Sequence, residues 1–135
     1  MTDLVIINPA ASHGIYGPLG DDLIAVEPPQ WVRLIAGYVR DQGFSVEIID
    51  AEARQLTPHQ VRGRIVLAKP NLVAIVVQGH QPSASTQQMW GAGILARARS
   101  GIGAATIMVG GHPSALPERT LREEVVDTLY EGQRP

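Results

Sequence analysis

Two loops of the sequence combine glycine, histidine and proline immediately after apolar strands. In residues 107–118, an apolar strand runs into Gly110-Gly111-His112-Pro113 and then an acidic helix start. In residues 78–86, Gln78-Gly79-His80 follows an earlier apolar run and leads to small hydroxyl side chains. Glycine lets the backbone approach a ligand closely, and proline stiffens the loop. Together the two loops indicate a rigid surface that holds a large, flat ligand.

The remaining polar residues offer little catalytic chemistry. Asp21-Asp22 and Glu123-Glu124 are adjacent pairs whose side chains diverge, so they are poor acid–base or metal partners. No serine lies in a nucleophile-elbow pattern. The chain has no cysteine, which excludes disulfides, zinc–thiolate sites and cysteine-ligated iron–sulfur clusters within it. We expect no catalytic residue and no protein-held metal site.

The composition is that of one globular domain. The chain has 135 residues, of which 44% are hydrophobic and 18% charged. A net charge of -2 without a basic stripe argues against a nucleic-acid partner. No apolar run reaches membrane-spanning length and no signal peptide is visible, so we expect no membrane partner and a cytoplasmic location.

Apolar runs alternate with amphipathic segments along the chain. Strands are predicted at 4–7, 44–49, 72–77, 105–109 and 126–130. A first helix follows Pro28-Pro29 and ends before Gly43, with Trp31 among its apolar residues. A second opens with a capping box at Thr57 and Gln60. A third runs from Ser83 or Ser85 to about residue 100, and a short one spans 117–124. Trp31 and Trp90 are expected in the core.

This alternation predicts a flavodoxin-like, Rossmann-like α/β fold, a three-layer parallel sheet of five strands in the order 2-1-3-4-5. Its topological switch point lies between the first and third strands, where ligands bind. The glycine- and proline-rich loop 8–28 and the loop 78–86 flank that point, which favours a functional role for both. A final helix covering the last strand is absent. The 1–135 domain is therefore expected to be the front part of a longer protein or to dock on a partner.

Several of these segments resemble the N-terminal cobalamin-binding domain of cobalamin-dependent radical S-adenosylmethionine enzymes. Those domains begin with a strand ending in Asn-Pro, here Asn8-Pro9, and their first helix leads from Pro-Pro to a strand that closes on Asp50. They carry Gly-Gly-x-His-x-(small)-x-x-Pro-Glu after the fourth strand. The stretch 110–118 is similar but one spacer residue shorter. The closing Asp-x-(apolar)-x-x-Gly-Glu-Gly pattern fits residues 127–132, although Gln133-Arg134 replaces the final Glu-Gly.

The resemblance implies cobalamin as the cofactor and a C-terminal radical S-adenosylmethionine domain as the partner. That domain, with its Cys-x-x-x-Cys-x-x-Cys iron–sulfur cluster and its S-adenosylmethionine, lies outside this chain. By this resemblance, residues 1–135 would bind cobalamin and present its cobalt face to the radical domain for methyl transfer. The implied cofactor-binding residues are Asn8, Pro9, Ala10, His13, Gly14, Gln78, Gly79, His80, Gln81, Pro82, Ser83, Ser85, Thr86, Gly110, Gly111, His112, Pro113, Glu131 and Gly132.

Within this set, the resemblance assigns the loop 8–28 to the edge of the corrin and residues 78–82 to the lower cobalt face. Ser83, Ser85 and Thr86 would bind the nucleotide tail, although a serine there also serves as a helix N-cap. Gly110 and Gly111 would lie along that tail, or form only a tight turn.

Other functions remain open. His13 is the one candidate cobalt ligand, as in histidine-ligated corrinoid carriers, but no aspartate stands where it would orient the imidazole. A stand-alone nucleotide- or flavin-binding module is the other alternative, and the aromatic content of 4% counts against flavin. Asp50 resembles the ribose-binding acid of dinucleotide sites. Because no Gly-x-Gly-x-x-Gly follows the first strand, it is expected to cap the strand end instead.

Overall fold

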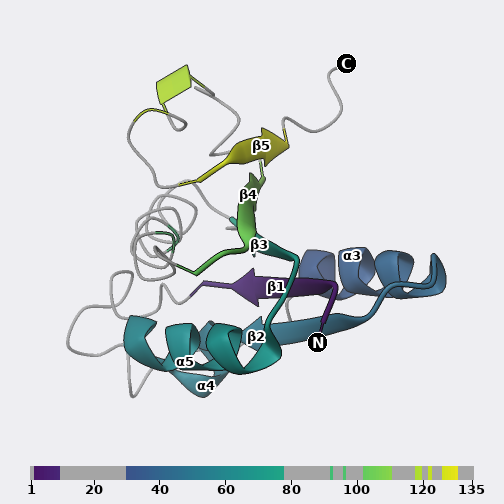
Figure 1. Ribbon diagram of the computed structural model, residues 1–135, viewed down its shortest axis with the longest axis horizontal. Coiled ribbons are helices and arrows are strands. Elements are labelled where there is room, and N and C mark those ends of the chain that lie inside the picture. Colours follow the sequence, from purple (N-terminus) through teal and green to yellow (C-terminus); the bar gives the residue numbers. More distant parts are fainter. Residues whose placement is uncertain are drawn as a thin grey trace.

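The computed structural model describes residues 2–9, 30–77, 102–110 and 126–130, together with positions 92, 96, 118, 119 and 122. Its strands are β1 (Leu4–Asn8), β2 (Val46–Asp50), β3 (Leu72–Val76), β4 (Ala105–Val109) and β5 (Thr128–Tyr130). They form one sheet in the order β2-β1-β3-β4-β5, and every neighbouring pair is parallel (Figure 1). The predicted parallel α/β architecture is confirmed.

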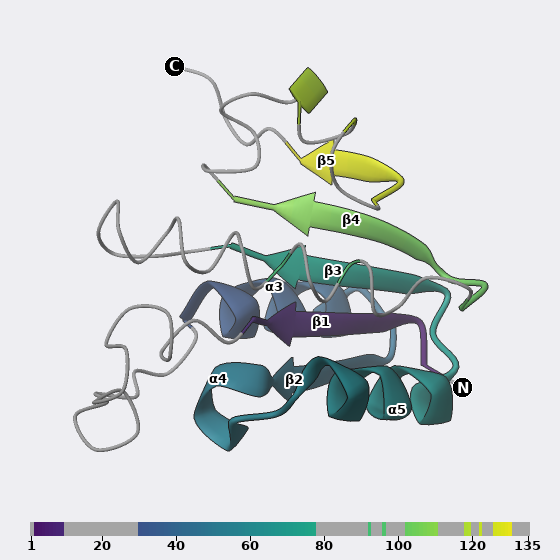
Figure 2. The same cartoon turned by 90° about the vertical axis from the view of Figure 1, so that its left-hand side faces the viewer.

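Helices lie on both faces of the sheet. Helix α3 (Gln30–Asp41) lies on one face, and α4 (Ala51–Arg54) and α5 (Pro58–Ala68) lie on the other (Figure 2). Right-handed crossovers explain this division. The connection from β1 to β2 travels across the sheet in one direction, whereas the connection from β2 to β3 travels in the opposite direction. Reversing the direction of travel moves the crossover helix to the opposite face.

Two apolar cores follow from the alternation of side chains along the strands. On the α5 face, Val5 and Ile7 of β1 pack with Val61 and Ile65 of α5. Ala92 and Ala96 belong to the same core, so the segment between β3 and β4 contributes to that face. On the α3 face, Val32 and Ala36 pack against Leu4, Ile6, Ala74 and Val76. The strands β1 and β3 are consequently buried on both sides.

Helix α5 begins as the sequence predicts. The Thr57 hydroxyl accepts from the backbone N–H of Gln60 at 3.2 Å, and the Gln60 side chain accepts from the backbone N–H of Thr57 at 2.9 Å. Val61, Ile65 and Ala68 face the core, and the helix ends before Pro70. The capping box satisfies two backbone donors that would otherwise lack a partner in the first turn.

The prediction that Trp31 is a core residue is wrong. Its side chain is 55% exposed, and the residues of α3 that are buried are Val32 and Ala36. Apolar residues occupy more than half of the circumference of this helix. The small side chains of Val32 and Ala36 let the helix approach the sheet, so its centre of contact lies on them. Trp90 lies outside the described residues.

Several boundaries also differ from the prediction: β1 continues to Asn8, β3 ends at Val76, and β5 begins at Thr128 and not at position 126. The second strand begins at Val46, and Phe44 is exposed, because residues 42–45 complete the turn after α3. The short helix α4 was not predicted, although Asp50 followed by Ala-Glu-Ala-Arg is a capped run of good helix formers. In the described part of the chain, no helix is long and apolar enough to cross a membrane.

Replacing Gly63 with alanine is expected to stabilise the protein by about 0.5–1 kcal/mol. Gly63 lies inside α5 and a Cβ there would meet no neighbouring atom, so the substitution removes backbone freedom from the unfolded chain. Gly43→Ala is the matched control. Gly43 has φ +95°, so alanine is expected to destabilise there. Urea unfolding of both variants tests this, and shifts of the same sign would contradict it.

The free energy of unfolding is expected to decrease at acidic pH because of Asp3. Its carboxylate accepts from the backbone N–H of Ser45 at 2.8 Å, from the Ser45 hydroxyl at 3.1 Å and from the Asn71 side chain at 3.4 Å. The Ser45 backbone bond, ahead of the side-chain bonds, lowers the pKa of Asp3 in the folded state. A lowered folded pKa gives stability that is present above the unfolded pKa and is lost as pH falls through the folded pKa.

The test compares the wild type with Asp3→Asn by urea unfolding at pH 6 and in steps below pH 4. The stability gap between the two proteins is expected to narrow as the pH falls. A gap that stays constant over that range would contradict the assignment.

Candidate functional site

The carboxyl ends of the parallel strands form one edge of the sheet. Asn8 ends β1, Asp50 ends β2, Val77 follows β3 and Gly110 follows β4. Since parallel strands all end on the same side, these four positions share that edge (Figure 2). Both loops singled out in the sequence begin there, one after Val77 and the other at Gly110. Of the predicted site residues, Asn8, Pro9 and Gly110 therefore lie at the edge where α/β sheets bind ligands.

Two polar side chains, Asn8 and Asp50, are hydrogen-bonded to each other at the carboxyl ends of β1 and β2. The Asn8 side chain donates to Asp50 Oδ1 at 3.0 Å, and the backbone N–H of Ala53 donates to the same oxygen at 3.0 Å. Asp50 is thus the N-cap of α4, which confirms its predicted role as a strand-end cap. The pairing with Asn8 was not predicted. It follows from the register, in which the two residues are direct partners.

The topological switch point lies between β1 and β3. From β1 the chain passes to β2 on one side, and after β2 it returns to β3 on the other side. In α/β sheets, a position of this kind is where ligands bind, beyond the carboxyl ends of the two strands. Asn8 and Pro9, both buried, form the β1 side of this point.

Gly110 is held against the end of β3 by backbone packing. The backbone N–H of Val77 donates to the carbonyl oxygen of Val109 at 2.8 Å, which extends the pairing of β3 and β4 by one residue. Gly110 has φ +140°, and a Cβ at this position would overlap the carbonyl oxygen of Val77. The position therefore requires glycine for a reason internal to the fold, and its role toward a ligand stays a prediction.

Of the predicted cofactor-binding residues, the structure describes Asn8, Pro9 and Gly110 and places them at one edge, separated by β3. The others lie outside the described residues: Ala10, His13, Gly14, Gln78, Gly79, His80, Gln81, Pro82, Ser83, Ser85, Thr86, Gly111, His112, Pro113, Glu131 and Gly132. In the described ranges, no group of three or more histidine, aspartate or glutamate side chains is placed to hold a metal ion.

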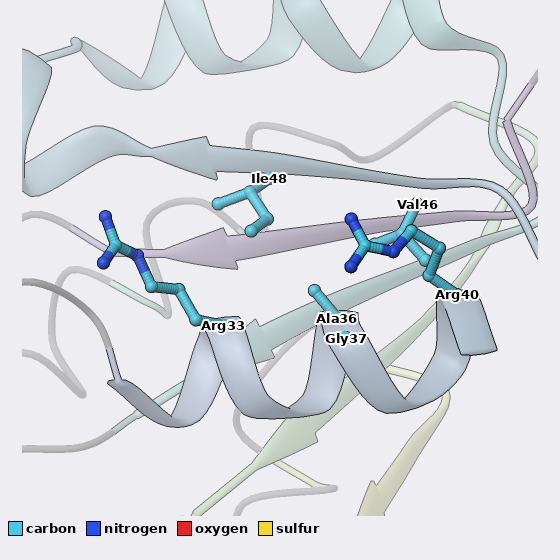
Figure 3. Close-up of a pocket in the computed structure, with 6 residues that line it drawn as sticks. All are labelled: Arg33, Ala36, Gly37, Arg40, Val46 and Ile48. Carbon is cyan, nitrogen blue, oxygen red and sulfur yellow. The ribbon is translucent and has the colours of Figure 1, made fainter.

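A shallow pocket of about 260 Å³ lies away from this edge, between α3 and β2. Its walls are Ala36 and Gly37 of α3 and Val46 and Ile48 of β2. Arg33 and Arg40 extend from α3 over β2 at its two ends (Figure 3). Sequence analysis did not predict it, because it depends on how the helix lies along the edge strand.

Replacing Gly110 with alanine is expected to destabilise the protein by about 2–3 kcal/mol, because a methyl group there would overlap the Val77 carbonyl in a backbone conformation that alanine avoids. The matched control is Gly103→Ala. Gly103 lies just before β4, and a Cβ there meets no neighbouring atom. Chemical unfolding of both variants measures the difference. Equal stabilities would show that the ends of β3 and β4 are not packed as described.

Comparisons with known proteins agree with this geometry. The model of the B12 binding domain family matches residues 19–134. The anaerobic magnesium-protoporphyrin IX monomethyl ester cyclase of Rubrivivax gelatinosus is 36% identical over 62 residues, which cover 45% of this chain and 11% of that protein.

Two structures of TsrM, a radical S-adenosylmethionine methyltransferase from Kitasatospora setae, share the fold. Each has a TM-score of 0.61 and 16% identity over 90% of this chain. One holds tryptophan substrate and a SAM analogue, and the other holds cobalamin and a [4Fe-4S] cluster. This chain spans 21% and 22% of those chains. Since the family model matches most of its length, the chain belongs to the B12-binding domain family, whose members bind cobalamin.

Proposed function

We propose that the domain binds cobalamin across the carboxyl edge of its sheet and presents the cobalt face to a radical S-adenosylmethionine domain outside residues 1–135, for methyl transfer. The observation that carries the proposal is the switch point between β1 and β3. It lies at the edge of the sheet where the loops 8–28 and 78–86 begin. The family match supplies the cofactor. The likeness in fold to a cobalamin-containing methyltransferase favours the reaction class.

The described residues fit such a cofactor. The edge is formed by the buried Asn8 and Pro9, by Val77 and by Gly110, whose lack of a side chain lets the ends of β3 and β4 pack closely. The Asp50 side chain accepts hydrogen bonds from both Asn8 and Ala53, so it is held in place at the end of β2. A corrinoid carries its own metal, so the proposal requires no metal ligand from the described residues.

This chain's residues would bind and orient the group. In the proposal, the loop after Pro9 contacts the corrin edge, residues 78–82 exclude water from the lower cobalt face, and residues 83–86 and 110–113 bind the nucleotide tail. Glu131 and Gly132 close the same end. When bound, a methylated corrinoid supplies the methyl group for transfer to a substrate radical. The rigid strand ends would hold these loops in one orientation toward the catalytic domain.

The experiment is retention of hydroxocobalamin by the purified chain after desalting, followed by a visible spectrum. We expect a retained corrinoid whose bands show a displaced lower base, unchanged in His13→Ala and His80→Ala. The matched control is His59→Ala, which changes an exposed histidine on α5.

The other outcomes contradict the proposal. Loss of the retained corrinoid in His13→Ala or His80→Ala, but not in His59→Ala, would indicate a histidine-ligated corrinoid carrier. A folded chain that retains no corrinoid would favour a nucleotide- or flavin-binding module. Circular dichroism of each sample establishes that the chain is folded.

A further inference from the structure

The hydrogen bonds of Asp50 set the orientation of the Asn8 side chain. Asp50 Oδ1 accepts from the backbone N–H of Ala53 at 3.0 Å, so this oxygen acts as an acceptor. The amide of Asn8 must therefore present its NH2 group to the same oxygen, and Asn8 Nδ2 lies 3.0 Å from it. Because the nitrogen and the oxygen of a planar amide point in different directions, Asn8 Oδ1 is turned away from Asp50.

Asn8 lies between Asp50 and the switch point. The register pairs it directly with Asp50 of β2, and β3 lies on the other side of β1. Asn8 is 8% exposed, so its side chain has little room to turn. An amide that is buried and held through its nitrogen offers its oxygen in one fixed direction. A group that binds a ligand gains from being held in this way.

We propose that Asp50 is a positioning residue for cobalamin: it holds the NH2 group of Asn8, so that Asn8 Oδ1 accepts a hydrogen bond from a carboxamide group on the rim of the corrin ring. This inference rests on the proposed function. The corrin ring carries primary carboxamide side chains, whose N–H groups need acceptors when binding removes them from water. An amide oxygen has two lone pairs, so Asn8 can accept this bond in addition to a bond within the protein.

The orientation of Asn8 before binding lowers the free-energy cost of binding. An asparagine amide that is free to turn over presents either a donor or an acceptor to a ligand. Fixing one arrangement in advance removes that loss of freedom from the binding step. Asp50 therefore acts without touching the cofactor, and its effect on affinity passes through Asn8.

Two substitutions of Asp50 separate this effect from helix capping. Both of its hydrogen bonds go to the same oxygen, so the single carbonyl oxygen of Asp50→Asn can accept both of them. Serine is also a good N-cap, so Asp50→Ser can still cap α4. Its side chain is shorter, however, and does not extend to Asn8. The asparagine variant therefore keeps the orientation of Asn8, and the serine variant loses it.

The experiment is isothermal titration of the full chain with hydroxocobalamin. Asp50→Ser is expected to weaken the affinity about tenfold, the change that corresponds to the loss of one hydrogen bond. Asp50→Asn is expected to bind within about threefold of the wild type, because a neutral oxygen accepts somewhat more weakly than a charged one. Equal losses of affinity in these two variants would overturn the inference.

Asp3→Ser is the matched control. The Asp3 carboxylate accepts from the backbone N–H of Ser45 at 2.8 Å and so joins the amino ends of β1 and β2, the same two strands that Asn8 and Asp50 join at the carboxyl ends. The control is expected to lower the free energy of unfolding in urea and to leave the affinity unchanged. A loss of affinity equal to that of Asp50→Ser would show that general stability controls binding, and would overturn the inference.

A double-mutant cycle tests whether Asp50 acts through Asn8. Asn8→Ala is expected to weaken binding about tenfold, and adding Asp50→Ser to it is expected to cause no further loss. Additive losses would overturn the inference, because Asp50 would then act by another route. The same cycle is repeated with cobinamide, which has the corrin carboxamides but lacks the nucleotide. A loss seen with hydroxocobalamin but not with cobinamide would place the contact at the nucleotide tail and would also overturn the inference.

Failure of this inference is distinct from failure of the proposed function. A wild type that binds the corrinoid while the cycle is additive overturns the inference alone. A folded wild type that binds no corrinoid overturns the proposed function and the inference with it. Circular dichroism shows whether each variant is folded. Asp50→Thr, another residue that caps helices, provides the same test if Asp50→Ser does not fold.

Discussion

All later features of this structure depend on one constraint: after β2, the connections cross the sheet in the opposite direction from the connection between β1 and β2. Because β2 lies on one side of β1 and β3 on the other, right-handed connections place α3 and α5 on opposite faces. That arrangement buries β1 and β3 on both sides and produces the two apolar cores. It also places the topological switch point between β1 and β3, the position at which α/β proteins bind ligands. One topological choice therefore sets both the core and the edge at which we propose that the cofactor binds.

At the carboxyl edge of the sheet, close contacts join neighbouring strand ends on either side of the switch point. Asn8 donates to Asp50, which also caps α4, and Gly110 packs directly on the carbonyl of Val77. These contacts hold the strand ends that precede the loops 8–28, 78–86 and 110–118. Cobalamin carries its own reactive metal, so the protein's task is to hold a large rigid group in one orientation. Rigid strand ends suit that task better than a set of catalytic side chains.

The same topology makes the two faces unequal. Helices α4 and α5 lie on one face, and α3 is the helix described on the other face, where it packs chiefly on β1 and β2. Apolar side chains at Trp31 and Tyr38 stay exposed beside the half-buried Ile107 and Val109 of β4.

Local signals in the sequence determined much of the fold. Apolar runs identified the strands, Thr57 and Gln60 identified the start of α5, and the alternation of elements gave a parallel sheet. Motif resemblance gave the cofactor class. The sequence did not determine which apolar residues of α3 face the core, because Trp31 and Val32 are equally compatible with a helix and only the approach of the sheet selects between them. The Asn8–Asp50 bond and the contact of Gly110 with Val77 likewise join residues distant in sequence, so they depend on strand register, which tertiary packing alone decides.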